Sequence, residues 1–213
     1  MTDFHRTSVD NRSFVRGAAR LLIAPYTQAK PTKISDVIAL ASASGVALYD
    51  AASGWTDLGA TKTGIQITIN NAEESFDVDQ IMGDISSAPT SWECSVGTQL
   101  AEMTPEKMQV AWEGSAITTD SGPTVPEVEI GFGQPTAYTQ RRLAVLFQRP
   151  NGKIRAYLFY KVQRMPQESS VTHSKTGEQI SIPVRFRALA DTTITDPYKR
   201  FFVIRDQSTV ASP

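Results

Sequence analysis

Residues 141–164 read RRLAVLFQRPNGKIRAYLFYKVQR, two apolar-rich runs joined through Asn151-Gly152. Asn and Gly tolerate the positive φ angles of a tight primed turn, so this stretch predicts a β-hairpin. We expect the hairpin to be among the longest paired elements of the protein. It indicates an antiparallel β-fold, and the sequence on both sides supports the same interpretation.

Alternation of apolar and polar residues extends outward from this hairpin. Residues 91–101, SWECSVGTQLA, predict a strand with one side in the core. Its apolar face carries Trp92, Cys94, Val96 and Leu100. Residues 179–190, QISIPVRFRALA, repeat the pattern with Arg185 and Arg187 outward, and Pro183 predicts an edge position or a bulge. Further strands are expected at RLLIAP (20–25), IQITIN (65–70), ESFDVDQ (74–80) and KRFFVIRD (199–206).

Helix signals are few. Residues 104–114, TPEKMQVAWEG, provide Thr104 as N-cap, Pro105 at the first helical position and Gly114 as a stop. A second short helix is expected near Thr32 in TKISDVIALAS, where apolar residues recur at helical spacing, although its β-branched residues have low helix propensity. The sequence therefore predicts a mainly antiparallel β-sandwich or barrel with one flanking α-helix.

The segment between Gly114 and Ala137 concentrates Gly, Pro, Ser and Thr, and only EVEIGF (127–132) in it is expected to pair as a strand. We predict a long loop, 114–137, of the functional or flexible kind. No linker divides the chain of 213 residues. We expect an N-terminal arm (1–20), one domain (21–205) and a C-terminal tail (206–213).

Composition excludes several classes of protein. The net charge is −1 and the pI is about 6.1, so bulk electrostatics does not favour nucleic acid or a membrane surface. The single Cys94 excludes an internal disulfide, and His5 and His173 supply no zinc cluster of conventional spacing. The first twenty residues lack an apolar core segment, so we expect neither a signal peptide nor a membrane helix, and synthesis in a cytoplasm.

The stretch GWTDLGATKTG, residues 54–64, approximates a phosphate-binding loop but does not match one. Ala60 occupies the position of the essential lysine, and Lys62 comes two residues late. The alternating segment that follows predicts a strand, where a phosphate site needs a helix N-terminus. We therefore expect the glycines to be conformational, in a loop with a buried Trp55 and Leu58 that leads into a strand.

No catalytic set is visible, so we expect no enzyme activity and no cofactor. Cys94 lies on the apolar face of its strand, which favours a buried thiol, and His173 lies in a polar turn. The acidic stretch EESFDVDQIMGD (73–84) supplies no EF-hand frame. Asp77 and Asp79 share a strand face, so low-affinity divalent binding is the alternative to an exposed acidic face.

The net charge of −1 is the sum of two blocks of opposite charge. Thr63–Glu106 contains eight acids and no Lys or Arg, whereas Arg141–Arg164 contains seven basic residues and no acid. The blocks either pair inside one chain or steer one copy toward the next in a head-to-tail contact. The candidate basic face between subunits consists of Arg141, Arg142, Arg149, Lys153 and Arg155.

Residues 54–114 carry an ordered series of short motifs. They are Asp57-Leu58-Gly59-Ala60-Thr61, Val78-Asp79-Gln80, the link from Gly83 to Thr90, Leu100-Ala101-Glu102 and the helix from Thr104. This order resembles the major tail tube protein of long-tailed bacteriophages, and the match covers roughly a third of the chain.

The resemblance implies a tail-tube-like fold whose copies close into hexameric rings, which stack into the hollow tube of the virion tail. Its implied partners are further copies, the tape-measure protein, the tail terminator, distal tail or baseplate proteins, and viral DNA in transit without sequence-specific binding. An acidic lumen would repel DNA phosphates and let the duplex slide. The candidate lumen-facing residues are Gln66, Thr68, Asn70, Glu73, Glu74, Asp77 and Asp79.

An alternative function is a β-sandwich binding module, such as a glycan-binding adhesin or another virion surface component. Trp55, Trp92 and Trp112 have the ring faces that stack on sugars. Trp92 alternates with core residues and Trp112 lies on the apolar face of the expected helix. We therefore expect most of these rings in the core.

Overall fold

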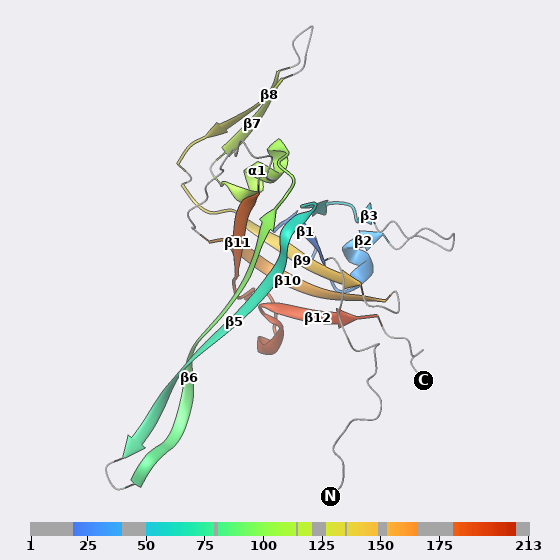
Figure 1. The fold of residues 1–213 in the computed structure, drawn as a ribbon. Helices are drawn as coiled ribbons and strands as arrows, with labels where there is room; N and C mark the ends of the chain where they lie inside the picture. The colour runs from blue at the N-terminus through green and yellow to red at the C-terminus, as the bar shows by residue number, and fades with distance from the viewer. Residues whose placement is uncertain are drawn as a thin grey trace, which may run out of the picture.

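The computed structural model describes residues 19–39, 50–78, 81–113, 115–120, 127–134, 136–148, 153–165 and 181–207. These residues form a mainly antiparallel β-structure with one α-helix, which confirms the predicted fold class (Figure 1). Several sequence expectations fall outside this part of the chain. They concern His5, Asp79, Gly114, Arg149, the Asn151-Gly152 turn and His173. Most of the expected N-terminal segment (1–20) and of the expected C-terminal tail (206–213) also lies outside it.

Eight antiparallel strands form the main sheet, and the expected hairpin of residues 141–164 is its β9–β10 pair. The strand order is β4 (Thr56–Asp57), β1 (Ala19–Pro25), β9 (Gln140–Gln148), β10 (Ile154–Arg164), β11 (Ile182–Ala188), β6 (Ile81–Leu100) and β5 (Thr61–Val78), and β12 (Phe202–Asp206) pairs with β10. The longest pair is β5–β6, because the two strands expected at 65–70 and 74–80 are one continuous strand.

The sheet curves around one hydrophobic core. Leu21 of β1 and Val96 of β6, from opposite parts of the strand order, belong to the same buried cluster as Phe159 and Phe186. β1 also contacts β5, although the two strands stand near opposite ends of the strand order, so the sheet is curved, as in an open barrel. Trp55 belongs to a second cluster on the other face of the sheet. That face is covered by the 3-10 turn η2 (Ile34–Asp36) and by β2 (Ile38–Ala39) and β3 (Asp50–Ala51).

The predicted helix is α1 (Pro105–Ala111). Thr104 has extended backbone angles and Pro105 opens the helix, as the sequence indicated. Ala111 is fully buried, and Met108 packs against the main core cluster. The helix thus closes one end of the curved sheet. A second 3-10 turn, η3 (Pro197–Lys199), precedes β12.

Two sequence predictions of local structure were wrong. The helix expected near Thr32 is only the single turn η2, followed by a short strand, because β-branched residues favour extended backbone. In the expected loop 114–137 the strand expected at 127–132 is present as β8 (Glu127–Phe132), but it pairs with a strand that was not predicted, β7 (Ser115–Asp120). The threonines of β7, which suggested a loop, lie in a strand, where Thr is favoured.

Two further expectations need correction. β11 lies between β10 and β6, so it is not an edge strand of the sheet. Pro183 lies in the first half of β11, which pairs with β6 but not with the described residues of β10. Pro183 is therefore tolerated at a local edge. Trp92 lies outside the buried core, with 37% of its surface exposed.

Replacing Phe186 by Ala should lower the free energy of unfolding by about 3–5 kcal/mol, because it leaves a cavity in the main core cluster. Arg187→Ala is the matched control, since Arg187 is the next residue and forms an exposed ion pair worth at most about 1 kcal/mol. Chemical denaturation measures both. Equal losses for the two variants would contradict this description of the core.

Candidate functional site

The β5–β6 hairpin extends well beyond the sheet that it joins (Figure 1). β6 pairs with β11 only from Ser95 to Leu100, whereas its pairing with β5 continues to Ile81. The side chains of residues 69–75 are all exposed, including those on both faces of β5. We call the part between Ile69 and Trp92 the arm. The arm has two strands, and the body leaves its described side chains near the base, residues 69–75, exposed to solvent.

The polar face of β5, β6 and β11 carries side chains in rows across the three strands. One row is Gln66, Gly97 and Arg185, and the next is Thr68, Ser95 and Arg187. An open groove of about 620 Å³ lies over Gly97 and is also lined by Thr63, Gly64, Gln66, Thr68, Thr98, Gln99, Met165, Pro183, Val184 and Arg185. The β5–β6 hairpin and β11, which is distant from it in sequence, therefore form one polar surface.

Both arginines of this polar face are engaged within it. Arg185 donates hydrogen bonds from Nε and Nη2 to the Ser95 hydroxyl, at 3.2 and 3.0 Å. Arg187 donates from Nε to the Glu93 carboxylate at 2.9 Å. Sequence analysis identified both arginines as outward but did not group them with the lumen candidates, because that requires the β6–β11 register.

The candidate lumen residues do not form one uniform acidic face. Gln66, Thr68 and Asn70 alternate along β5 and lie together on the polar face. Glu73 and Glu74 are exposed in the arm, but as consecutive strand residues they point to opposite sides. Asp77 lies in β5, and Asp79 lies outside the described residues.

The candidate basic face is largely occupied by contacts inside the chain. Arg141 forms an ion pair with Glu113 at 2.9 Å, and Arg155 forms one with Asp206 at 2.7 Å. Arg142 is only 8% exposed, so it cannot belong to an exposed face. Of the acids that pair with these arginines, none belongs to the acidic block Thr63–Glu106. Lys153 is half-buried.

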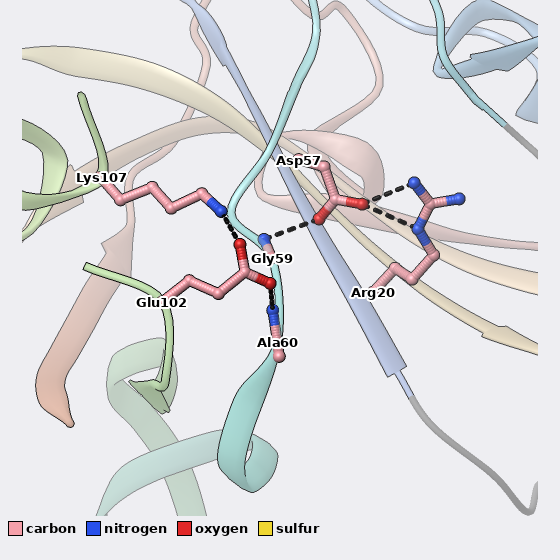
Figure 2. A network of polar contacts seen from close by, with 6 residues as sticks. All are labelled: Arg20, Asp57, Gly59, Ala60, Glu102 and Lys107. Carbon is pink, nitrogen blue, oxygen red and sulfur yellow. Dashed lines mark hydrogen bonds and ion pairs between the residues drawn. The ribbon is translucent and has the colours of Figure 1, made fainter. Parts of the chain in front are cut away.

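A network of polar contacts fixes the bend between β4 and β5 (Figure 2). Asp57 accepts hydrogen bonds from Arg20 Nε and from the Gly59 N–H, both at 2.9 Å. Glu102, after β6, accepts one from the Ala60 N–H at 2.8 Å and pairs with Lys107 of α1. The Lys107 ammonium, and then the Ala60 N–H, hold the pKa of Glu102 below its ordinary value.

This bend also explains the glycines that approximated a phosphate loop. Gly54, Gly59 and Gly64 have φ angles of 82°, 81° and 76°, so they are conformational, as expected. A side chain at Gly59 would lie against the Glu102 carboxylate and the Lys107 ammonium. The site therefore orients the start of the long β5 strand.

A buried polar cluster surrounds Asp191, which is 1% exposed. Its Oδ1 accepts hydrogen bonds from the Thr193 hydroxyl at 2.6 Å and from the Tyr26 hydroxyl at 3.2 Å. Arg142 lies 3.9 Å from Oδ2 and donates to the Tyr160 carbonyl at 2.9 Å. Burial acts to raise the pKa of Asp191, but the hydrogen bonds from Thr193 and Tyr26 and the charge of Arg142 outweigh it, so this pKa is lowered. The cluster ties the segment after β11 to β9 and the end of β1.

The remaining chemistry-bearing residues show no catalytic arrangement within the described ranges. Cys94 is fully buried, as predicted, and burial raises the pKa of its thiol to about 11. Among the described residues, no three His, Cys, Asp or Glu side chains gather as they would to hold a metal ion. In the same part of the chain, no helix is long and apolar enough to span a membrane. No protein-family model and no curated protein matches this sequence.

Substitution of the bend glycines by Ala should separate the cost of a positive φ angle from the cost of displacing neighbouring side chains. Gly64→Ala should lower the free energy of unfolding by about 1–2 kcal/mol, because of its positive φ alone. Gly59→Ala should cost more, since Glu102 and Lys107 must also move. Gly131→Ala is the control, because no atom lies within 4 Å of the new methyl group and its φ is not positive. A loss at Gly131 as large as that at Gly59 would refute this account of the bend.

Asp191→Asn should lower the free energy of unfolding near neutral pH by about 1–3 kcal/mol, because it weakens hydrogen bonds to a charged group. Because the folded pKa lies below the unfolded one, ionised Asp191 contributes stability above the unfolded pKa of about 3.9. That contribution disappears as the pH falls through the folded pKa. Denaturation at about pH 6 and about pH 3 should therefore show a smaller difference between wild type and variant at the lower pH.

The exposed Glu129→Gln variant is the control for the Asp191 experiment. A difference between Asp191→Asn and wild type that is the same at both pH values would show that the charge of Asp191 does not contribute.

Proposed function

We propose that the protein is a structural virion subunit that self-assembles into stacked hexameric rings, forming the hollow tail tube of a long-tailed bacteriophage. The observation that carries this proposal is the β5–β6 hairpin, which leaves the sheet and exposes both of its faces. Two-stranded ribbons are at best marginally stable alone in water. Under this proposal, contacts with a neighbouring copy stabilise the arm, and the arm joins the two copies.

The edge of β5 supports the same function. β5 is 18 residues long and has β6 as its only strand partner within the described residues. An open edge of this length offers unpaired N–H and C=O groups to another chain. Joining such edges between identical copies extends the sheet from subunit to subunit, and a rotation that closes gives a ring.

The polar face next to this edge suits the wall of a channel for DNA. Arg187 is compensated by Glu93, and Arg185 is bonded to Ser95. Only one of the exposed Glu73 and Glu74 points to this side, so with Glu93 the charged side chains of the face sum to 0, from two arginines and two glutamates. A surface with this balance holds DNA phosphates weakly, because strong binding needs several uncompensated basic groups.

The partners under this proposal follow from the resemblance to tail tube proteins. They are further copies of the chain, the tape-measure protein, the tail terminator, distal tail or baseplate proteins, and DNA in transit. The location is the virion tail.

The glycan-binding alternative has less support. Trp55 is 6% exposed, and the Trp112 ring packs edge-on against Phe132 at 5.3 Å between centroids. Trp92 is the most exposed of the three, but its ring packs against Phe201 at 4.2 Å. Stacking on sugars needs an open ring face, so no observation favours this function over self-assembly.

Concentrated purified protein should form rings or hollow rods in negative-stain electron micrographs, and species larger than a monomer in light scattering. A variant in which Asn-Gly replaces residues 73–90 should remain monomeric. That replacement keeps the Ala72–Ser91 register and so preserves the base of the hairpin. The variant should unfold with nearly the wild-type free energy, because the arm residues 73–75 and 89–90 that it removes are exposed.

Wild-type protein that stays strictly monomeric at high concentration would contradict the proposal. Assembly of the shortened variant to the same extent as wild type would contradict the role of the arm.

A further inference from the structure

Five of the seven exposed large apolar side chains in the described part of the protein fall into two groups, and Tyr138 and Tyr198 belong to neither. The ribbon patch lies on one face of β8 and consists of Val128, Ile130 and Phe132. The arm-base patch lies where the arm leaves the body and consists of Ile69, Trp92, Phe201 and Ile204. Exposure reaches 54% at Phe132, 51% at Ile204 and 49% at Ile69.

The ribbon patch belongs to a two-stranded element with sparse cover. β7 and β8 pair only with each other among the described strands. The face with Val128 and Phe132 is apolar, and Phe132 touches Trp112 with one edge while more than half of its surface stays exposed. An apolar face on a ribbon that contacts the body mainly through α1 favours a further surface that covers it.

The arm-base patch extends the main core into solvent. Ile69 pairs with Cys94 in the β5–β6 register, and Trp92 lies two residues from Cys94 on the same face of β6. The Trp92 ring rests on Phe201, and Ile204 lies two residues beyond Phe202 on one face of β12. The patch is therefore continuous with buried side chains, yet its outer surface is open.

The two patches lie at opposite ends of the body. Figure 1 shows β7 and β8 beyond α1 at the upper end of the body, and β12 at its lower edge near the base of the arm, which extends further. The patches of one chain therefore do not cover each other. Two different surfaces at opposite ends are what a repeating head-to-tail contact requires.

The charges around the patches are complementary. Residues 115–134 carry three acids and no Lys or Arg. The segment 199–206, which bears Phe201 and Ile204, carries three basic residues and one acid, and of the basic residues Lys199 pairs with Asp196 just before the segment. Electrostatic complementarity of this kind orients one copy relative to the next and disfavours contacts between like ends.

We propose that the ribbon patch of one copy docks on the arm-base patch of the next, and that this is the contact by which successive copies stack. The inference rests on the proposed self-assembly and specifies its second interface, separate from the β5 edge. Docking covers apolar side chains at both ends, and because the contact is heterologous it repeats without closing.

Cross-linking between two variants, each with one added cysteine, tests this docking. Phe132→Cys and Ile204→Cys are prepared as full chains and mixed in the presence of a bis-maleimide. Native Cys94 stays silent in both variants, because it is fully buried and its pKa is about 11. A covalent dimer should form in the mixture, and none in either variant alone. Thr118→Cys is the matched control, since Thr118 is exposed on the opposite face of the same ribbon and should not replace Phe132→Cys.

Other outcomes overturn the docking. Rings or rods without this cross-link would refute it while leaving the proposed function intact, whereas absence of every assembly would refute both. A dimer of Ile204→Cys with itself would indicate an isologous contact between like ends. A cross-link that appears only after deletion of residues 2–18 would show that the chain's own N-terminal segment covers a patch. Denaturation confirms that each variant is folded.

Discussion

The difference in length between the β5–β6 pair and the sheet beside it governs the architecture. β11 has seven residues and pairs with β6 only up to Ser95, so the body cannot support the β6 strand that runs back to Ile81. Backbone pairing between the two long strands continues beyond the core, and their side chains become exposed once the core ends. The arm, the open edge of β5 and the arm-base patch all follow from this single mismatch.

Within the body, by contrast, the arginines of the basic block find partners in their own chain. Arg141, Arg142 and Arg155 are engaged by Glu113, Asp191 and Asp206, so three of the seven basic residues of this block are compensated inside the fold. The acids of the arm and of the β7–β8 ribbon project away from the body instead. The molecule combines a self-sufficient core with two acidic projections, which is a division suited to a subunit that acts through contacts with its own copies.

The sequence predicted what depends on local pattern and missed what depends on register. Alternation and Asn151-Gly152 indicated β9–β10, and Thr104-Pro105 indicated α1, because both signals lie within a few residues. β8 was predicted from its alternation, but its partner β7 was missed, since the threonines of β7 occur in loops as well as in strands. The association of Arg185 with Gln66 across Gly97 was also missed, because it depends on two strand registers that no local pattern determines.

Hydrogen exchange of the backbone amides in residues 69–75 tests the central claim most directly, because these amides belong to a ribbon that the described residues of a single copy leave exposed. In unassembled protein they should exchange much faster than the amides of β9 and β10. On assembly, their protection should rise toward that of the core. If these amides are already as protected as the core in a monomer, or gain no protection in rings or rods, the arm and the β5 edge do not join copies.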